Sequence, residues 1–148
     1  MDRPSDSPGS APETLTELIL RTSAQVSSSL GIRLKPLGVQ VDEMRVLHAL
    51  SAAGGMSMTE LSDALVIGGP TLTRMADRLV SENLLYRAPD PHDRRRVRLH
   101  LTDTGRACAA EAAEIVADMQ QLLTVRFAEL DLDDLSSALA RTASPLDD

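Results

Sequence analysis

One short stretch with strict alternation constrains the fold of this chain more than any other feature. Residues 97–101, "VRLHL", place Val, Leu and Leu on one side of an extended chain and Arg and His on the other. This period-two pattern predicts a β-strand with one buried face. A second candidate strand, "LLYRA" at residues 84–88, comes before it, and the intervening "PDPHDRR" has two prolines and two aspartates that cannot continue either strand. The sequence therefore predicts a β-hairpin.

Two short helices are predicted immediately before this hairpin. The first begins at Ser57, where Glu60 completes the pattern of a capping box, and it runs to about Leu65. "IGGP" then makes a tight break, in which Gly68 and Gly69 allow unusual backbone angles. The second helix, "TLTRMADRLVSE", has an apolar face, and the following Asn can adopt the left-handed conformation that ends it. Two helices joined by a tight turn and followed by a hairpin predict a winged helix-turn-helix.

Longer amphipathic helices are predicted at both ends of the chain. Apolar residues recur every three or four positions from residue 13 to residue 34 and again from residue 107 onward. Their apolar surface exceeds what a small winged helix can cover. We therefore expect a mainly α fold with a small β-hairpin wing, in which residues 13–34 and 107–148 form a dimerisation region and residues 35–106 form the winged helix-turn-helix. Residues 1–12, rich in Pro, Ser, Gly and Asp, are expected to be disordered.

Positive charge is concentrated in one part of an acidic chain. The net charge of the 148 residues is -7, yet Arg94, Arg95, Arg96 and Arg98 fall within five positions. Residues 74–106 contain eight arginines and five acidic residues, or +3, which leaves -10 for the remainder. Such asymmetry is typical of nucleic-acid binders whose other surfaces are acidic. On charge alone, a solvated loop fits equally well.

Several other classes of function are disfavoured by the sequence. Cys108 is the only cysteine, and its place among alanines on an apolar helical stripe favours a buried structural role over a redox role. His48, His92 and His100 lack the spacing of a metal-binding motif, so neither a metal nor a cofactor is expected. The chain has no nucleophile elbow, Walker loop or dinucleotide fingerprint, so we do not expect it to be an enzyme. No apolar run approaches the roughly 20 residues of a membrane span, and no signal peptide pattern is present, so we expect a cytoplasmic protein with no membrane partner.

Three stretches resemble the MarR family of winged-helix regulators. They are "TELSDAL", "TLTRMADRLVSENLLYR" and "DPHDRRRVRLHLTDTGR", and the last is the most specific, with its Asp-Arg-Arg, alternating strand and Leu-Thr-x-x-Gly. The resemblance covers about residues 13–141. It implies a homodimer that binds a pseudo-palindromic operator in double-stranded DNA, with recognition helices in successive major grooves and wings in the flanking minor grooves. It also implies a transcriptional repressor that a small-molecule effector releases from DNA.

The resemblance assigns roles to residues of the recognition helix, which corresponds to about residues 70–82. The candidate DNA contacts there are Pro70, Thr71, Thr73, Arg74 and Arg78. For Arg78 a second role stays open, an ion pair with Asp77 or with a wing residue. This chain departs from the family's pattern at residues 68–70, where Gly-Gly-Pro replaces polar side chains. Together with the acidic balance, that departure supports an alternative function, a winged-helix protein-interaction module that no longer reads DNA.

The wing and the effector site are assigned in the same way. The candidate DNA contacts in the wing are Arg94, Arg95 and Arg96, and Arg95 matches the residue that enters the minor groove, whose negative potential attracts guanidinium groups. Asp93 matches the acidic residue that braces the wing. An effector pocket is expected between the first, second and fifth helices, with Leu20, Val46 and Ile115 as its candidate lining.

Overall fold

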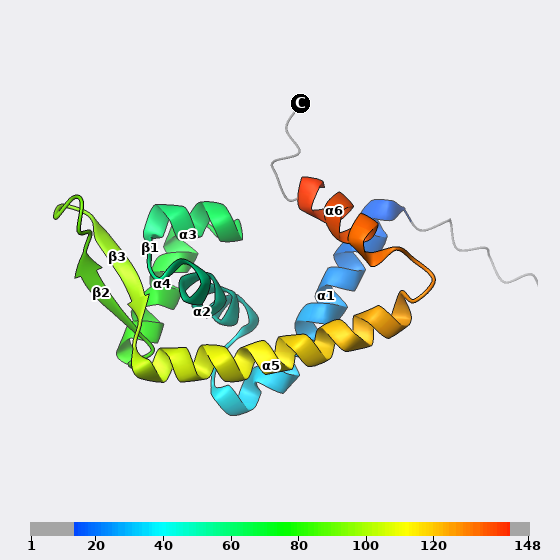
Figure 1. Ribbon diagram of the computed structural model, residues 1–148, viewed down its shortest axis with the longest axis horizontal. Helices are drawn as coiled ribbons and strands as arrows, with labels where there is room; N and C mark the ends of the chain where they lie inside the picture. Colours follow the sequence, from blue (N-terminus) through cyan, green and yellow to red (C-terminus); the bar gives the residue numbers. More distant parts are fainter. Residues whose placement is uncertain (1–13, 143–148) are drawn as a thin grey trace, which may run out of the picture.

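One long helix, α5 (Asp103–Arg126), connects the two ends of the molecule in the computed structural model, which describes residues 14–142 (Figure 1). The hairpin lies beyond the N-terminal end of α5, and α6 (Leu132–Thr142) and the start of α1 (Leu15–Leu34) lie near its other end. The remaining elements are a 3-10 helix η1 (Lys35–Leu37), α2 (Val41–Ala53), β1 (Met56–Ser57), α3 (Met58–Leu65), α4 (Gly69–Ser81), β2 (Leu85–Pro89) and β3 (Val97–Leu101). The expected mainly α architecture with a β-hairpin wing is confirmed.

The capping box predicted at Ser57 is present. The Ser57 hydroxyl accepts a hydrogen bond from the backbone N–H of Glu60 at 3.2 Å, and the Glu60 carboxylate accepts one from the backbone N–H of Ser57 at 2.7 Å. Asn83 has the expected left-handed conformation, with φ of 58°. These local signals therefore place the start of α3 and the end of α4 correctly.

The turn between α3 and α4 differs from the prediction. Gly68 has φ of -60° and Gly69 is already helical, so neither glycine supplies a left-handed residue. That conformation falls on Val66, with φ of 54° and ψ of 49°, and its side chain is 79% exposed. A β-branched residue in this region is strained, because its side chain crowds the backbone.

The hairpin belongs to a three-stranded antiparallel sheet with the order β1-β3-β2. Leu85 pairs with Leu101, and Pro89 pairs with Val97 at the far end of the hairpin. Pro89 therefore lies within β2, although the sequence placed it in the loop. On its other side β3 pairs with β1, a strand of two residues. The sheet joins the hairpin to the start of α3.

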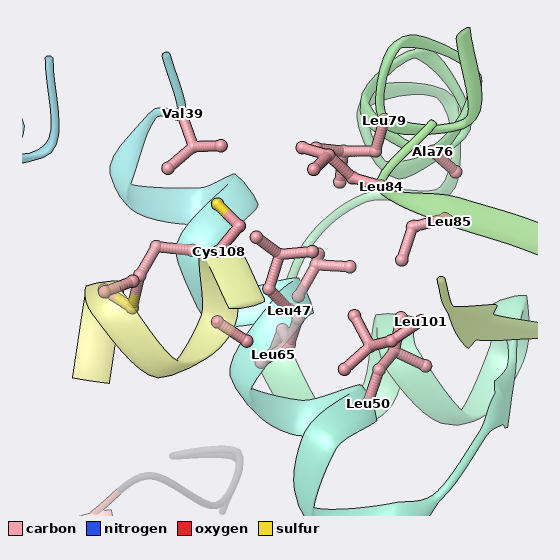
Figure 2. Packing of buried hydrophobic residues seen from close by; sticks show 14 of the residues in the cluster. Val39, Leu47, Leu50, Leu65, Ala76, Leu79, Leu84, Leu85, Leu101 and Cys108 are labelled. Carbon is pink, nitrogen blue, oxygen red and sulfur yellow. The ribbon is translucent and has the colours of Figure 1, made fainter. Parts of the chain in front are cut away.

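The core is almost entirely aliphatic and lies between α2, α3, α4 and the sheet. Figure 2 shows side chains from α2 facing those from the end of α4 and from the sheet. The largest fully buried side chains are Leu34, Val46, Leu47, Leu50, Leu61, Leu72, Leu79, Leu85 and Leu99. Cys108 is also buried, as expected from its stripe of alanines. This packing holds α4 and the hairpin on one common body.

The helices at the other end of the molecule leave apolar surface exposed. Leu15 is 73% exposed on α1, and no residue of α6 is buried. Other large apolar side chains exposed in this region are Leu18, Ile19, Leu122, Val125, Leu130 and Leu139. Within residues 14–142, none of the helices combines the length and apolar character that crossing a bilayer requires. The predictions for residues 1–12 and for the last six residues lie outside the described part of the chain.

Candidate nucleic-acid interface

The exposed face of α4 carries three of the predicted contact residues. Thr71, Thr73 and Arg74 are exposed, and the Thr73 hydroxyl donates a hydrogen bond to the Gly69 carbonyl at 2.9 Å. Among the hydrogen bonds and ion pairs of residues 14–142, none involves the Arg74 guanidinium. Pro70 is exposed in the first turn of the helix, and the space around the Gly69 Cα is open. The start of α4 can therefore approach a partner closely, and Arg74 is available to it.

Arg78 lies on the same helix but is engaged within the protein. Its Nη1 donates to both carboxylate oxygens of Glu43, at 2.7 and 2.9 Å, and its Nε donates to Glu82 at 3.1 Å. The expected pairing of Arg78 with Asp77 or with a wing residue is wrong. Asp77 instead pairs with Arg87 of β2, and this ion pair connects α4 to the wing.

The tip of the wing is exposed and is shaped by Asp93. One Asp93 carboxylate oxygen accepts the backbone N–H of Arg95 at 3.1 Å, and the Asp93 carbonyl accepts the backbone N–H of Arg96 at 2.8 Å. The Nε of Arg96 lies 3.5 Å from the second carboxylate oxygen. The side chains of Arg94 and Arg95 have no hydrogen bond or ion pair within the described residues. Asp93 therefore holds the turn mainly through the backbone and leaves both of these guanidinium groups free.

Arg98 belongs to a different environment from the other three wing arginines. Its Nη2 donates to the Gly55 carbonyl at 2.7 Å, and its Nη1 donates to Asp90 at 3.2 Å. Asp90 is only 8% exposed and also accepts the backbone N–H of His92 at 2.8 Å. This backbone bond lowers the pKa of Asp90, and the Arg98 charge acts in the same direction. Arg98 thus fastens the stem of the wing to the body.

Glu60 adds a second carboxylate beside Arg98, at 3.3 Å from its Nη2. The backbone N–H of Ser57 holds the pKa of Glu60 below its ordinary value, and Arg98 contributes in the same direction. The sequence placed Arg98 in the positive cluster and outside the candidate DNA contacts, but it predicted none of these partners. The available signal was the place of Arg98 inside the alternating strand, where its side chain is fixed by neighbouring segments.

Similarity to known proteins identifies the family. The sequence model of the MarR family matches residues 37–96. The multiple antibiotic resistance protein MarR of Escherichia coli is 32% identical over 111 residues, which cover 74% of this chain and 77% of that protein. This chain belongs to the MarR family.

Solved structures of MarR-family proteins extend the match over most of the chain. CouR, a transcriptional repressor whose structure is bound to a 23-mer DNA duplex, is 32% identical with a TM-score of 0.80, covering 88% of this chain and 93% of CouR. A mutant MarR from E. coli in complex with operator DNA is 29% identical with a TM-score of 0.73, covering 88% of this chain and 94% of MarR. These relatives are transcription regulators and not enzymes.

The three side chains predicted to line an effector pocket in this MarR-family chain, Leu20, Val46 and Ile115, are not part of the lining of the cavity between α1, α2 and α5. Val46 is completely buried in the core, and Leu20 is 62% exposed on α1, so the two side chains do not share a pocket. Ile115 is partly buried and packs against the core. A cavity of about 290 Å³ nevertheless lies between the expected helices, lined by Leu30, Met44, Arg45, His48, Ala49, Leu65, Ala109, Ala112, Ala113 and Val116.

The three histidines and Cys108 of this MarR-family chain lie in different environments. His48 is exposed on α2, His92 lies in the wing loop, and His100 stacks on Tyr86 with ring centroids 5.3 Å apart. Between residues 14 and 142, no three His, Cys, Asp or Glu side chains are grouped as a metal site would require. Burial raises the pKa of the Cys108 thiol, which disfavours the reactive thiolate.

Proposed function

We propose that this chain is a sequence-specific DNA-binding repressor of transcription that acts as a homodimer in the cytoplasm. The observation that carries the proposal is the set of unpaired guanidinium groups on α4 and at the wing tip: Arg74, Arg94 and Arg95. Exposed, unpaired arginines in a chain of net charge -7 are available for phosphate oxygens, and such contacts release counterions from DNA. The likeness to CouR bound to a DNA duplex supports the same function.

Each element has a separate part in this proposal. The helix α4 enters the major groove, where the candidate contacts are Pro70, Thr71, Thr73 and Arg74. The wing reaches the flanking minor groove with Arg95, while Arg94 and Arg96 contact the phosphate backbone of the DNA. Asp93 keeps the wing turn in shape. A narrow minor groove has an enhanced negative potential that favours an inserted guanidinium.

The dimer is formed by residues 13–34 and 107–148, around two bodies made of residues 35–106. The exposed apolar side chains of α1, α5 and α6, including Leu15, Leu122 and Leu139, support this assignment because nothing within residues 14–142 covers them. Contiguous apolar surface of this kind marks interfaces. Two symmetric recognition helices bind half-sites whose centres lie about 10 bp apart, or one helical turn of DNA.

A small, mainly apolar effector binds the cavity of about 290 Å³ between α1, α2 and α5. The cavity supports this assignment because apolar side chains from all three helices line it, with Arg45 and His48 as its ionisable lining residues. Such an effector acts only if it binds the DNA-free arrangement more tightly than the DNA-bound one.

A mobility-shift assay with the DNA upstream of the chain's own gene tests the proposal. Wild-type protein is expected to shift this duplex at ~150 mM salt in excess random DNA, because specific complexes persist there. Arg95→Ala is expected to weaken the shift strongly while the dimer persists in analytical ultracentrifugation. The proposed role of the wing would be wrong if its affinity stayed within about twofold of wild type, since a lost charge contact to DNA costs more than this.

A protein-interaction module is the second candidate function. The observation that favours it is the start of α4, where Gly68 and Gly69 present no side chains that could read bases. Under this alternative, the same assay would show no preference for the upstream duplex over random DNA.

A further inference from the structure

A carboxylate removed from water lies at the start of α2. Glu43 is only 2% exposed, and its Oε2 accepts the backbone N–H of Gln40 at 2.8 Å, which caps the helix. The only cationic side chain paired with Glu43 among residues 14–142 is Arg78, from α4. An ionised carboxylate is costly to bury unless it is paired and hydrogen-bonded. The Glu43–Arg78 pair is therefore a required part of this packing.

All three guanidinium nitrogens of Arg78 are engaged. Besides the bonds to Glu43 and Glu82, its Nη2 donates to the backbone carbonyl of Gly38 at 2.8 Å. The negative charge of Glu43 is the main cause that raises the pKa of Arg78. Arg74, one turn earlier on α4, has no such partners. The two arginines of α4 are thus in opposite situations.

Two partners of Arg78, Gly38 and Glu43, lie in the segment that connects the N-terminal arm to the body. Gly38 follows η1, has φ of 70°, and separates α1 from α2. Glu43 lies in the first turn of α2. A single side chain near the end of α4 therefore holds two points of the link between α1 and α2.

We propose that Arg78 is a positioning residue, which fixes the recognition helix α4 to the link between α1 and α2 through Glu43 and Gly38 and does not contact DNA. The inference rests on the proposed function in one respect, since fixing α4 affects DNA reading only if α4 reads DNA. Because α1 belongs to the dimerising arms, this tie sets the angle between arm and recognition helix. In a dimer, that angle determines the distance between the two recognition helices.

The test compares three variants with wild type: Glu43→Gln, Arg78→Lys and the double variant. Lysine keeps the positive charge but cannot reach all three acceptors, and glutamine keeps the size of Glu43 without its charge. The probe is a duplex that the wild-type protein selects from a random-sequence pool. Each single variant is expected to lose about tenfold in affinity, and the double variant about the same rather than a hundredfold, because residues of one network are not additive.

The salt dependence of binding separates positioning from phosphate contact. Arg78→Gln is added here because it removes the charge that Arg78→Lys keeps. In Glu43→Gln and Arg78→Gln, the slope of log affinity against log salt is expected to equal that of wild type. Arg74→Gln is the matched control on the same helix, and it is expected to reduce the slope by about 0.9, the value for one lost phosphate contact. A similar reduction in Arg78→Gln, with Glu43→Gln unchanged in affinity, would overturn the inference in favour of direct DNA contact. Unchanged affinity in both single variants would also overturn it.

If the wild-type protein selects no sequence, the proposed function is refuted but the inference about Arg78 is not. Hydrogen exchange tests the inference in that case as well. Exchange at the amides of residues 78–82 and 38–44 is measured in wild-type protein, Glu43→Gln and Arg78→Lys. Faster exchange in both segments of both variants supports the tie, because the two segments then open together. Unaltered exchange in either variant would show that Arg78 does not hold the helix.

Discussion

Replacing Gly105 with alanine is expected to destabilise the protein by about 3 kcal/mol, because this glycine allows a close contact between α5 and the backbone before β2. A Cβ at residue 105 would lie 1.9 Å from the Leu84 carbonyl oxygen and 2.9 Å from its carbon. The Leu84 carbonyl oxygen also accepts the backbone N–H of Thr102 at 3.1 Å. Neither the carbonyl nor the helix can move without breaking that hydrogen bond.

The magnitude follows from the overlap and from the bonds that it breaks. Relieving the overlap needs a separation of about 1.5 Å, from 1.9 Å to an ordinary contact of 3.4 Å. Overpacking of this kind costs about 1–3 kcal/mol. Two hydrogen bonds of Thr102 would also be lost. Its backbone N–H donates to the Leu84 carbonyl, and its hydroxyl accepts the backbone N–H of Gly105. Each contributes about 1 kcal/mol. The better helix propensity of alanine offsets about 1 kcal/mol, which leaves about 2–4 kcal/mol.

Urea unfolding followed by circular dichroism measures this change, with all proteins at one concentration because the stability of the proposed dimer would depend on concentration. Gly31→Ala is the matched control, since Gly31 lies inside α1 and a Cβ there would meet only the Cγ2 of Val41, at an ordinary contact distance of 3.9 Å. It is expected to leave stability unchanged or to raise it by up to about 1 kcal/mol. If Gly105→Ala unfolds within about 0.5 kcal/mol of wild type, the range of ordinary surface substitutions, steric contact with Leu84 does not explain the glycine.

Three further predictions concern strain, ionisation and thiol reactivity. Val66→Gly is expected to stabilise the protein by about 1 kcal/mol in thermal unfolding, because it relieves a left-handed β-branched residue; a lower melting temperature would contradict this reasoning. The backbone N–H of His92 and the side chain of Arg98 lower the pKa of Asp90 in the folded protein. These bonds therefore stabilise the fold at pH values above about 4, the pKa of an aspartate in the unfolded chain. Their contribution is lost as the pH falls through the lower pKa of Asp90 in the folded protein. Asp90→Asn should therefore destabilise the protein at pH 7 and progressively less below about pH 4 in urea titrations, whereas an equal effect at both pH values would refute the assignment. Cys108 should react with a thiol reagent slowly in the native protein and rapidly in urea, and equal rates would show that it is accessible.

The sequence predicted those parts of the fold that short-range signals encode. The capping box at Ser57 and Glu60 spans three residues, and the alternation of residues 97–101 is complete within one strand. Both were confirmed, as was the left-handed Asn83. The strand β1 was missed because two residues are too few to show a period. The left-handed residue was expected at a glycine, but it lies at Val66, where two hydrogen bonds between Ser62 and the backbone of Ile67 close the turn.

The candidate site was predictable in its location but not in its internal pairing. Arg78 and Glu43 are separated by 35 positions, and no local pattern indicates that they meet. Arg98 looks like its neighbours in sequence, yet the Gly55 carbonyl that binds it comes from 43 residues earlier. For the cavity, none of the three predicted side chains is part of the lining. Val46 faces the core, because the core and cavity faces of α2 lie close together and differ only in side-chain direction.

The anchoring of the wing at its stem has a mechanical consequence. Arg98 ties β3 to the turn before α3, and Arg87 ties β2 to the recognition helix, so hairpin and helix form one stiff unit from which only the loop tip projects. In the proposed DNA-binding dimer, such a unit cannot adapt to operators of different half-site separation by bending the hairpin. Any adjustment of that separation has to arise in α1, α5 and α6, where two subunits would pivot against each other.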